Sequence, residues 1–434
     1  MVAGFEIVTP FAVQPVRQAR GDLMTDSVFH SGSSTFRPLT WSLSKMVEWV
    51  GAKMIGEPKS GALTVTFPNN VSRTIGDPQT GFHARVKFNN FNVLHQTMRR
   101  GTLGFAAAYI NGDVEVCNLT DLFRFFLQNI EMFDNSNPGI FRRAAKDIAY
   151  HVSRANSLAG SRKNIAEHYD LGNDFYSLWL DPSMTYSSAI FARDDMSLEQ
   201  AQKEKYHRIA AMAGVKPGSR VLEIGCGWGG MAKTLAEDFK AIVHGITLSR
   251  EQLKFARDCM VKYALDDRVD LEFEDYRDTK GRFDHVCSIE MIEAVGEEHW
   301  PHYFKVVHDR LKPGGTATIQ AITIDEIHFD AYRSGPDFIQ RYIFPGGMLL
   351  TKSAMLEQGE KVGLKLEKTQ CFANSYAKTL QIWHQRFVDE WPQIRQLGYD
   401  ESFRRKWEYY MSYCESGFSE GFIDVGIYQY RRPG

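Results

Sequence analysis

Glycine residues cluster in the middle of the chain, directly after a run of apolar residues. The segment Val221-Leu-Glu-Ile-Gly225-Cys-Gly227-Trp-Gly229-Gly230 predicts a buried strand that ends in a sharp bend, and Met231–Phe239 predicts the helix that follows. Glycine is needed at such a bend because a Cβ atom would push the backbone away from a bound ligand. We therefore expect Gly225, Gly227 and Gly229 to bind a nucleotide-type cofactor.

The polar residues around this bend favour S-adenosylmethionine over a dinucleotide. A dinucleotide fold would place an acidic residue at the end of the second strand, where this chain has Thr247, followed by Gln252. Glu223 lies instead in the first strand, which suits a methyltransferase. The third strand is followed by Asp275 and Tyr276, which offer a carboxylate and an aromatic ring to an adenine. All these positions lie at or near the carboxyl ends of strands, where such sheets bind ligands.

From about Gly160 onward, strand-like segments alternate with helix-sized ones. The expected strands are Val221–Ile224, Ala241–Ile246, Val269–Phe273, His285–Ile289 and Thr316–Ile319. This alternation predicts an α/β fold of the Rossmann-like, class I methyltransferase type, with a mostly parallel, doubly wound sheet covered by helices on both faces. Because a fold does not fix the acceptor, a small-molecule N- or O-methyltransferase is an alternative.

The first part of the chain has a different pattern. Two segments alternate like half-buried strands, Ala62–Phe67 and Ala84–Phe88. The turn-forming residues Pro68–Asn70 and Gly76–Pro78 lie between them. Two stretches are helix-like, Leu43–Ile55 and Asn92–Arg100. We predict a small α+β domain over residues 1–135, a connector over residues 136–160 and a catalytic domain over residues 161–434.

Positive charge is concentrated in and just after the connector. The only acidic residue in this stretch is Asp147, whereas the basic residues are Arg142, Arg143, Lys146, Arg154, Arg162 and Lys163. Charge runs are usually solvated, so one interpretation is an exposed helix and linker. The other is a patch that holds anionic phospholipid headgroups, where each charge contributes about 1 kcal/mol.

The composition excludes several classes of protein. A net charge of −2 gives no basic excess for nucleic-acid binding. The six cysteines are scattered without a CxxC pair, which favours reduced thiols in a cytoplasm and no metal site. Neither a signal peptide nor an apolar run of roughly 18 residues is evident. We expect a cytoplasmic protein that visits the inner face of the membrane if its substrate is a lipid.

Six motifs in order resemble the cyclopropane fatty acid synthase family, which includes the mycolic acid cyclopropane synthases. They are His168–Asp174, Met184–Ser187, Leu222–Gly230, Asp275–Asp278, Leu311–Gly315 and Arg341–Gly346. Residues 61–135 are also similar to the lipid-binding-type N-terminal domain of full-length synthases. The resemblance implies a dimeric enzyme that uses S-adenosylmethionine to modify double bonds in the acyl chains of membrane phospholipids.

The resemblance also implies roles for individual residues. The cofactor would be held by Tyr186, Ser187, Gly225, Gly227, Thr247, Gln252, Tyr276 and Ile289. The family's base is a bicarbonate ion, and the positions matching its ligands are Ser188, Glu293, Gln320, Ile322 and Tyr376. Two of these depart in type, because the family has a cysteine at Ser188 and a histidine at Gln320. Beside Glu293 the family usually has a histidine, and this chain has Ala294.

The chemistry requires a dry, aligned site. Methyl transfer to an alkene creates a carbocation, which aromatic faces stabilise and water would destroy. Candidates for the acyl tunnel are Phe338, Tyr342 and Phe344, within the segment Ala331–Leu349 that we expect to form a lid.

The product depends on the base that removes the proton. Removal from the new methyl group closes a cyclopropane, whereas removal from another carbon, or hydride delivery, leaves a methylene or methyl branch. Glutamine is a neutral amide that balances an anion less well than histidine, so Gln320 favours methylation without ring closure. A true cyclopropane synthase is the alternative, if Ser188 and Gln320 still hold bicarbonate. Glu293 is a candidate for direct action as the base if burial raises its pKa.

Overall fold

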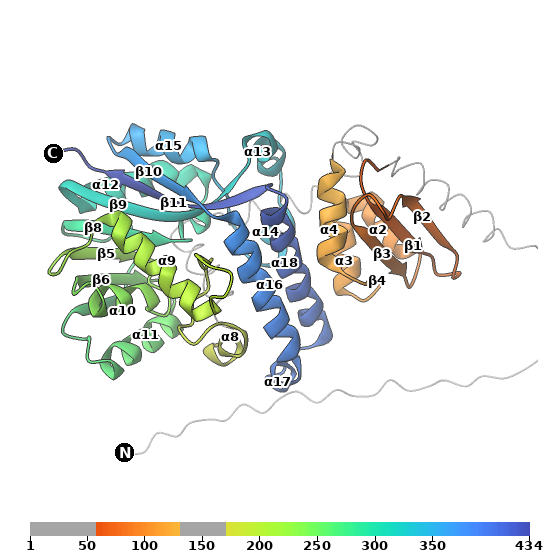
Figure 1. Ribbon diagram of the computed structural model, residues 1–434, viewed down its shortest axis with the longest axis horizontal. Helices are drawn as coiled ribbons and strands as arrows, with labels where there is room; N and C mark the ends of the chain where they lie inside the picture. Colours follow the sequence, from red (N-terminus) through yellow and green to blue (C-terminus); the bar gives the residue numbers. More distant parts are fainter. Residues whose placement is uncertain (1–57, 131–170) are drawn as a thin grey trace, which may run out of the picture. The chain divides into compact units, whose positions relative to one another are not determined.

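The computed structural model describes residues 58–130 and 171–434, and a seven-stranded sheet forms the centre of residues 171–434 (Figure 1). The strand order is β10-β11-β9-β8-β5-β6-β7. In chain order the strands are β5 (Arg220–Ile224), β6 (Ile242–Thr247), β7 (Val269–Phe273), β8 (Phe283–Ile289), β9 (Leu311–Ile324), β10 (Lys365–Cys371) and β11 (Ile423–Arg431). The pairs from β9 through β8, β5 and β6 to β7 are all parallel. This confirms the predicted α/β fold with a mostly parallel sheet.

The two strands that the sequence did not predict are β10 and β11. Both pair in antiparallel fashion, β11 with β9 and β10 with β11. Strand β10 lies at the sheet edge and its side chains are mostly exposed, so Lys365–Cys371 lacks the apolar alternation that predicts a strand. The predicted strand Thr316–Ile319 is the middle of the longer β9.

Helices cover both faces of the sheet because neighbouring side chains on each strand point in opposite directions. Val221 packs in one cluster with side chains of α9 (Leu198–Ala213), α10 (Gly230–Glu237) and α11 (Arg250–Lys262). Leu222 packs in another with side chains of α12 (Trp300–Arg310) and α15 (Lys352–Lys361). The sheet is therefore doubly wound, as predicted.

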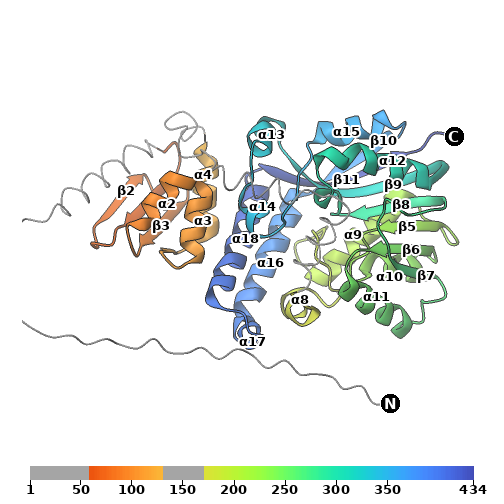
Figure 2. The ribbon, with the colours of Figure 1, turned by 180° about the vertical axis from the view of Figure 1, so that it is seen from behind.

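The remaining helices of the catalytic part lie around the carboxyl ends of the parallel strands or connect them. They are α8 (Asn173–Trp179), η1 (Ile292–Ala294), η2 (Glu297–His299), α13 (Glu326–Arg333), α14 (Phe338–Tyr342), α16 (Ala373–Asp389), α17 (Trp391–Gln396) and α18 (Glu401–Ser419). Helices α16 and α18 run side by side in both ribbon views (Figure 2). No helix in the described ranges is long and apolar enough to cross a membrane.

Residues 58–130 form a smaller sheet with the order β2-β1-β3-β4. Its elements are β1 (Ala62–Thr66), β2 (Ser72–Gly76), β3 (His83–Phe88), α2 (Asn92–Arg100), α3 (Thr102–Ile110), β4 (Val114–Val116) and α4 (Leu119–Gln128). The strands expected around Ala62 and Ala84 and the helix expected from Asn92 are confirmed. Strand β2 is polar and mostly exposed, which is why no hydrophobic pattern marked it.

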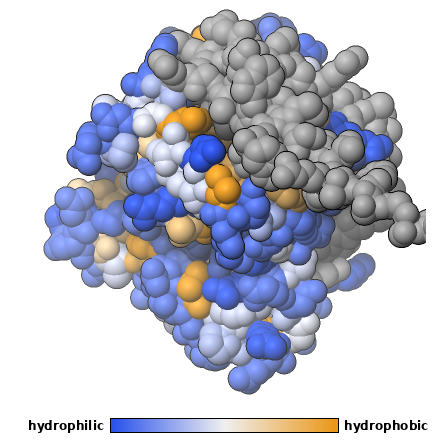
Figure 3. Space-filling model, turned by 90° about the vertical axis from the view of Figure 1, so that its right-hand side faces the viewer, coloured by the Kyte–Doolittle hydropathy of each residue, from blue (hydrophilic) through white to orange (hydrophobic). Residues whose placement is uncertain are grey.

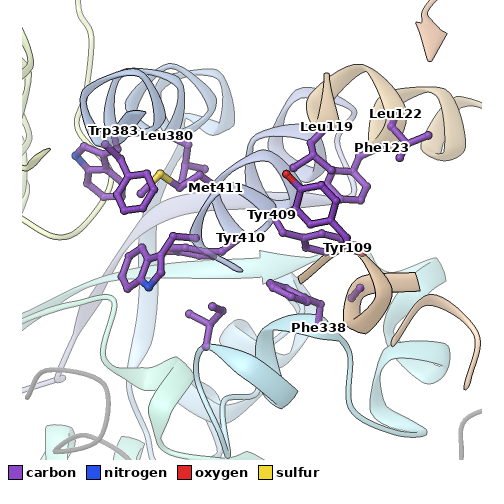
Figure 4. Close-up of a cluster of buried hydrophobic side chains, with 14 of the residues drawn as sticks. Tyr109, Leu119, Leu122, Phe123, Phe338, Leu380, Trp383, Tyr409, Tyr410 and Met411 are labelled. Carbon is purple, nitrogen blue, oxygen red and sulfur yellow. The ribbon is translucent and has the colours of Figure 1, made fainter. Parts of the chain in front are cut away.

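The described residues, 58–130 and 171–434, belong to one compact unit, in which helix α4 packs on α18 (Figure 4). The Phe123 ring lies 4.8 Å from that of Tyr409. At the edge of this contact the Arg124 Nε atom lies 2.5 Å from a carboxylate oxygen of Glu420. The expected helix Leu43–Ile55 and the connector over residues 136–160 lie outside the described residues.

Candidate active site

A cavity opens beside the glycine-rich bend at the carboxyl ends of β5, β6 and β8. The residues that line it and were predicted to bind the cofactor are Tyr186, Ser187, Glu223, Gly225, Gly227, Thr247, Gln252, Tyr276 and Ile289. They come from segments as far apart in sequence as Tyr186 and Ile289, and the parallel sheet brings them together. The lining also includes Glu274 and Glu290, which the sequence did not single out.

The bend itself has the geometry that only glycine adopts easily. The φ angles of Gly225, Gly227 and Gly229 are +85°, +52° and +86°. The Gly225 and Cys226 amides both donate to the Ile246 carbonyl, which fixes the bend to the neighbouring strand. A Cβ atom added to Gly227 would meet no protein atom within 4 Å. The backbone therefore leaves room for a ligand at Gly227.

Glu223 provides a test of whether the site fits S-adenosylmethionine. Its side chain is buried in the cavity wall, and its Oε2 atom has no hydrogen-bond partner among the described residues. Burial raises its pKa to about 8, and the nearby charge of Lys205 opposes that rise. A carboxylate in this setting needs a cationic partner. The ammonium group of the methionine part of the cofactor is such a partner, so the residues present fit S-adenosylmethionine.

Two of the residues predicted for the cofactor lie outside the lining of the cavity. The Asp275 carboxylate is bound by its neighbour Arg277, at 2.8 Å from Nε and 2.7 Å from Nη2. Glu274 takes the place expected for Asp275 at the cavity wall. Gly229 begins α10, and a Cβ atom there would contact Ala256 rather than the cavity. Asp275 and Gly229 thus hold the fold around the site.

Tyr186 links the cavity to a group of buried aromatic rings. Its ring centroid lies 5.5 Å from that of Trp179 and 5.4 Å from those of Tyr176 and Trp383. Its hydroxyl donates to the Tyr410 hydroxyl at 3.0 Å. Aromatic faces attract cations and exclude water. This wall is suited to a sulfonium group and to a carbocation beside it.

Three of the five residues predicted to hold bicarbonate converge instead on the carboxylate of Glu290. The Ser188 amide donates to Oε1 at 2.8 Å, and the Gln320 side-chain amide donates to the same oxygen at 2.7 Å. The Tyr376 hydroxyl donates to Oε2 at 2.7 Å. The structure brings Ser188, Gln320 and Tyr376 together, and in this chain the anion that they bind is a side chain.

The other two members of the predicted set pair with each other. The Ile322 amide donates to Glu293 Oε1 at 2.6 Å, and Glu293 Oε2 is buried with no partner among the described residues. Burial and the negative charge of Glu290 raise the pKa of Glu293 to about 8. Burial also raises the pKa of Glu290, but the Ser188 amide, the Lys205 charge and two further donors oppose this rise. Glu290 is therefore the better-stabilised anion, and Glu293 is held protonated near neutral pH.

These residues do not fit a bicarbonate ion, because Glu290 already uses the donors that would hold one. The backbone supports this conclusion, since Glu290 has a φ of +48°, in the left-handed region that favours glycine. Such strain costs about 1 kcal/mol or more and persists where the surroundings over-determine it. The sequence offered one signal that was missed, an acidic residue immediately after Ile289 at the end of a strand in the site.

The predicted tunnel residues separate in the structure. The Phe344 ring lies 6.4 Å from that of Tyr186 and 6.1 Å from that of Tyr410, so it belongs to the aromatic wall. Phe338 packs in the core, 4.2 Å from Tyr409 and 5.3 Å from Tyr342 (Figure 4). Phe344 is thus the best placed of the three to contact an acceptor.

A parallel sheet with a glycine bend, an acidic first strand and an aromatic wall at its carboxyl end defines a class I S-adenosylmethionine-dependent methyltransferase. Residues 156–428 match the family model described as mycolic acid cyclopropane synthetase, and the chain belongs to this family. It is therefore an enzyme of the S-adenosylmethionine-dependent methyltransferase class.

Individual relatives agree with this assignment. The chain is 37% identical over 395 residues to tuberculostearic acid methyltransferase UfaA1 of Mycobacterium tuberculosis, covering 87% of this chain and 85% of that one. It is 33% identical over 335 residues to cyclopropane-fatty-acyl-phospholipid synthase of Escherichia coli, covering 77% and 84%. The crystal structure of mycolic acid cyclopropane synthase CmaA1 with SAH and CTAB superposes with a TM-score of 0.59 at 29% identity, covering 62% of this chain and 98% of that one.

Proposed function

We propose that this enzyme methylates a carbon–carbon double bond in an unsaturated fatty acyl chain of a membrane phospholipid, and that the product chain stays open. The names of UfaA1 and the Escherichia coli synthase support a fatty acyl acceptor. The observation that supports an open-chain product is the position of the Glu290 carboxylate, which accepts hydrogen bonds from Ser188, Gln320 and Tyr376. The homodimer and the location at the inner membrane face are part of the same proposal.

The aromatic wall orients the reactants and excludes water. When bound, S-adenosylmethionine supplies an electrophilic methyl group. Tyr186 and Phe344 hold the alkene in line with that group, so that its π electrons form the new carbon–carbon bond and leave a cation on the neighbouring carbon. The ring faces around Tyr186 stabilise this cation.

Glu290 accepts the proton that the cation must lose. Its three hydrogen bonds fix the position of the carboxylate and weaken it as a base. A weaker, tethered base allows a neighbouring hydride to move to the cation before the proton leaves. Proton loss after that migration yields an alkene with a one-carbon branch instead of a ring.

The test compares Glu290→Gln and Glu290→Gly with the parent enzyme, with and without added bicarbonate. General-base catalysis contributes roughly 100-fold to 10,000-fold, so we expect Glu290→Gln to lose at least about 100-fold in turnover. Glu290→Gly frees all three donors and relieves the φ strain, so bicarbonate should restore turnover and introduce cyclopropane product. Nuclear magnetic resonance of the isolated fatty acids distinguishes ring protons from those of a branch. A parent enzyme that makes cyclopropanes, and only with bicarbonate, would contradict the proposal.

The acceptor class needs its own experiment, since a small-molecule N- or O-methyltransferase is the rival. Unsaturated phospholipid vesicles are incubated with the enzyme and with S-adenosylmethionine labelled in its methyl group. Label in the acyl chains supports a lipid acceptor. Label that never enters the lipid, under conditions where small amines or phenols are methylated, excludes it.

A further inference from the structure

Lys205 of α9 is a cation that the proposed reaction has not used. It is fully buried, with 0% of its surface exposed, and among the described residues no other lysine or arginine is buried to this degree. Its ammonium group donates to the Ser187 hydroxyl at 2.5 Å and lies 4.4 Å from the Tyr206 ring centroid. A buried charge costs several kcal/mol unless it is compensated, so its surroundings must supply negative charge.

The segment that Lys205 contacts is the one that reaches Glu290. One turn earlier on α9, the Gln202 side chain donates to the Ser187 carbonyl at 2.8 Å. Two anchors on one helix thus hold Ser187, and the next amide, that of Ser188, donates to Glu290. Tyr186, on the other side of Ser187, forms part of the aromatic wall.

Lys205 interacts with carboxyl groups from three separate segments of the chain. Glu290 at the end of β8, Asp181 in the loop before Ser187, and Glu223 in β5 all act on its ammonium group. Burial lowers the pKa of Lys205 to about 7, and the attraction of these three carboxyl groups opposes that change. On α9 itself the neighbouring Tyr206 adds the face of its ring.

We propose that Lys205 is a positioning residue of the reaction, which fixes the Tyr186–Ser188 segment against Glu290 and supplies the counter-charge that keeps this carboxylate in its basic form. The inference rests on the proposed role of Glu290. It agrees with the geometry of the two carboxylates, because the segment that Lys205 holds donates to Glu290 and not to Glu293.

The first test is the pH dependence of turnover in Lys205→Met. Loss of the positive charge raises the pKa of Glu290, so its basic form appears only at higher pH. We expect the acidic limb of the turnover profile to move up by at least about half a pH unit, since a nearby opposite charge shifts a carboxyl by 1 to 3 units. Lys203→Met is the matched control, because Lys203 lies on the same helix but pairs at the surface with Asp238.

The second test needs no acyl acceptor and therefore separates this inference from the proposed function. Melting temperatures are measured with S-adenosylhomocysteine bound for Lys205→Met, Glu290→Gln and the double variant. The double variant should lose less than the sum of the two single losses, because neither charge is then left without its partner. If the two losses in melting temperature add and the pH profile of Lys205→Met does not move, the proposal is overturned and Lys205 has only a packing role.

Discussion

Glu290 and Glu293 lie three residues apart and differ in what surrounds their carboxyl groups. Glu290 receives donors on both oxygens, whereas Glu293 receives one and leaves Oε2 without a partner among the described residues. Because their surroundings differ in this way, the two neighbouring carboxyl groups have different proton affinities. One site can thus hold an anion and a neutral acid side by side.

The protonated state of Glu293 predicts how stability depends on pH. Its pKa rises from 4.5 to about 8 on folding, so its contribution to stability is complete below about pH 4.5 and is lost as the pH rises through about 8. Glu293→Gln cannot lose a proton, so its melting temperature relative to the parent should increase between pH 6 and pH 9. Glu298→Gln, at an exposed neighbouring carboxyl, serves as the control and should follow the parent. If the melting temperatures of the parent and of Glu293→Gln change with pH in parallel, the assignment of a protonated Glu293 is contradicted.

At the level of single residues, the sequence predicted the cofactor site better than the base. Gly225, Gly227 and Glu223 could be recognised because their roles depend on local bends and on strand ends. Glu290 was missed although it directly follows Ile289 at a strand end, because its role depends on donors from Ser188 and Gln320, which only the fold brings to it. Three of the five positions carried over from the family donate to Glu290, and the other two, Glu293 and Ile322, pair with each other.

Helix α18 connects the two parts of the chain through adjacent tyrosines. Tyr410 contacts Tyr186 at the active site, and Tyr409 packs against Phe123 of α4. No sequence pattern predicted this contact, since the pairing of elements nearly 300 residues apart is a tertiary property. Strand β11 was not predicted for a similar reason. It follows α18 and pairs with β9 in antiparallel fashion, which is also a tertiary property.

Phe123→Ala tests how much this helix contact stabilises the protein. Removing a buried phenylalanine costs about 3 kcal/mol or more, so we expect a clear fall in the unfolding free energy measured with denaturant. Affinity for S-adenosylhomocysteine should change little, because Phe123 does not line the cofactor cavity. Phe91→Ala, at a half-exposed ring on the same small domain, should cost far less. Equal losses for the two variants would show that the α4 contact contributes little.

At the level of the whole molecule, the described surface of the face in Figure 3 is mostly hydrophilic, with small separate hydrophobic patches. Under the proposal that the enzyme acts at the inner membrane face, the basic residues predicted for the connector are the candidates for electrostatic attachment.

Replacing Arg142, Arg143 and Lys146 by alanine should weaken binding to anionic vesicles by roughly 100-fold, since each charge contributes about 1 kcal/mol near such a surface. Sedimentation with the vesicles at low and high salt measures the effect, and salt should reduce the difference. Replacing Lys361, Lys365 and Lys368 removes the same charge from the catalytic domain. An equal loss in that variant would assign the binding to net charge instead of the connector.

The left-handed backbone at Glu290 has a consequence for how this residue can be replaced. Glycine adopts that conformation without strain, and some glycine and glutamate codons differ by a single nucleotide. One point mutation can therefore remove the proposed proton acceptor of this enzyme with no rearrangement of the main chain. The three hydrogen-bond donors stay in place, and the space of the lost carboxylate is left to an anion from solution.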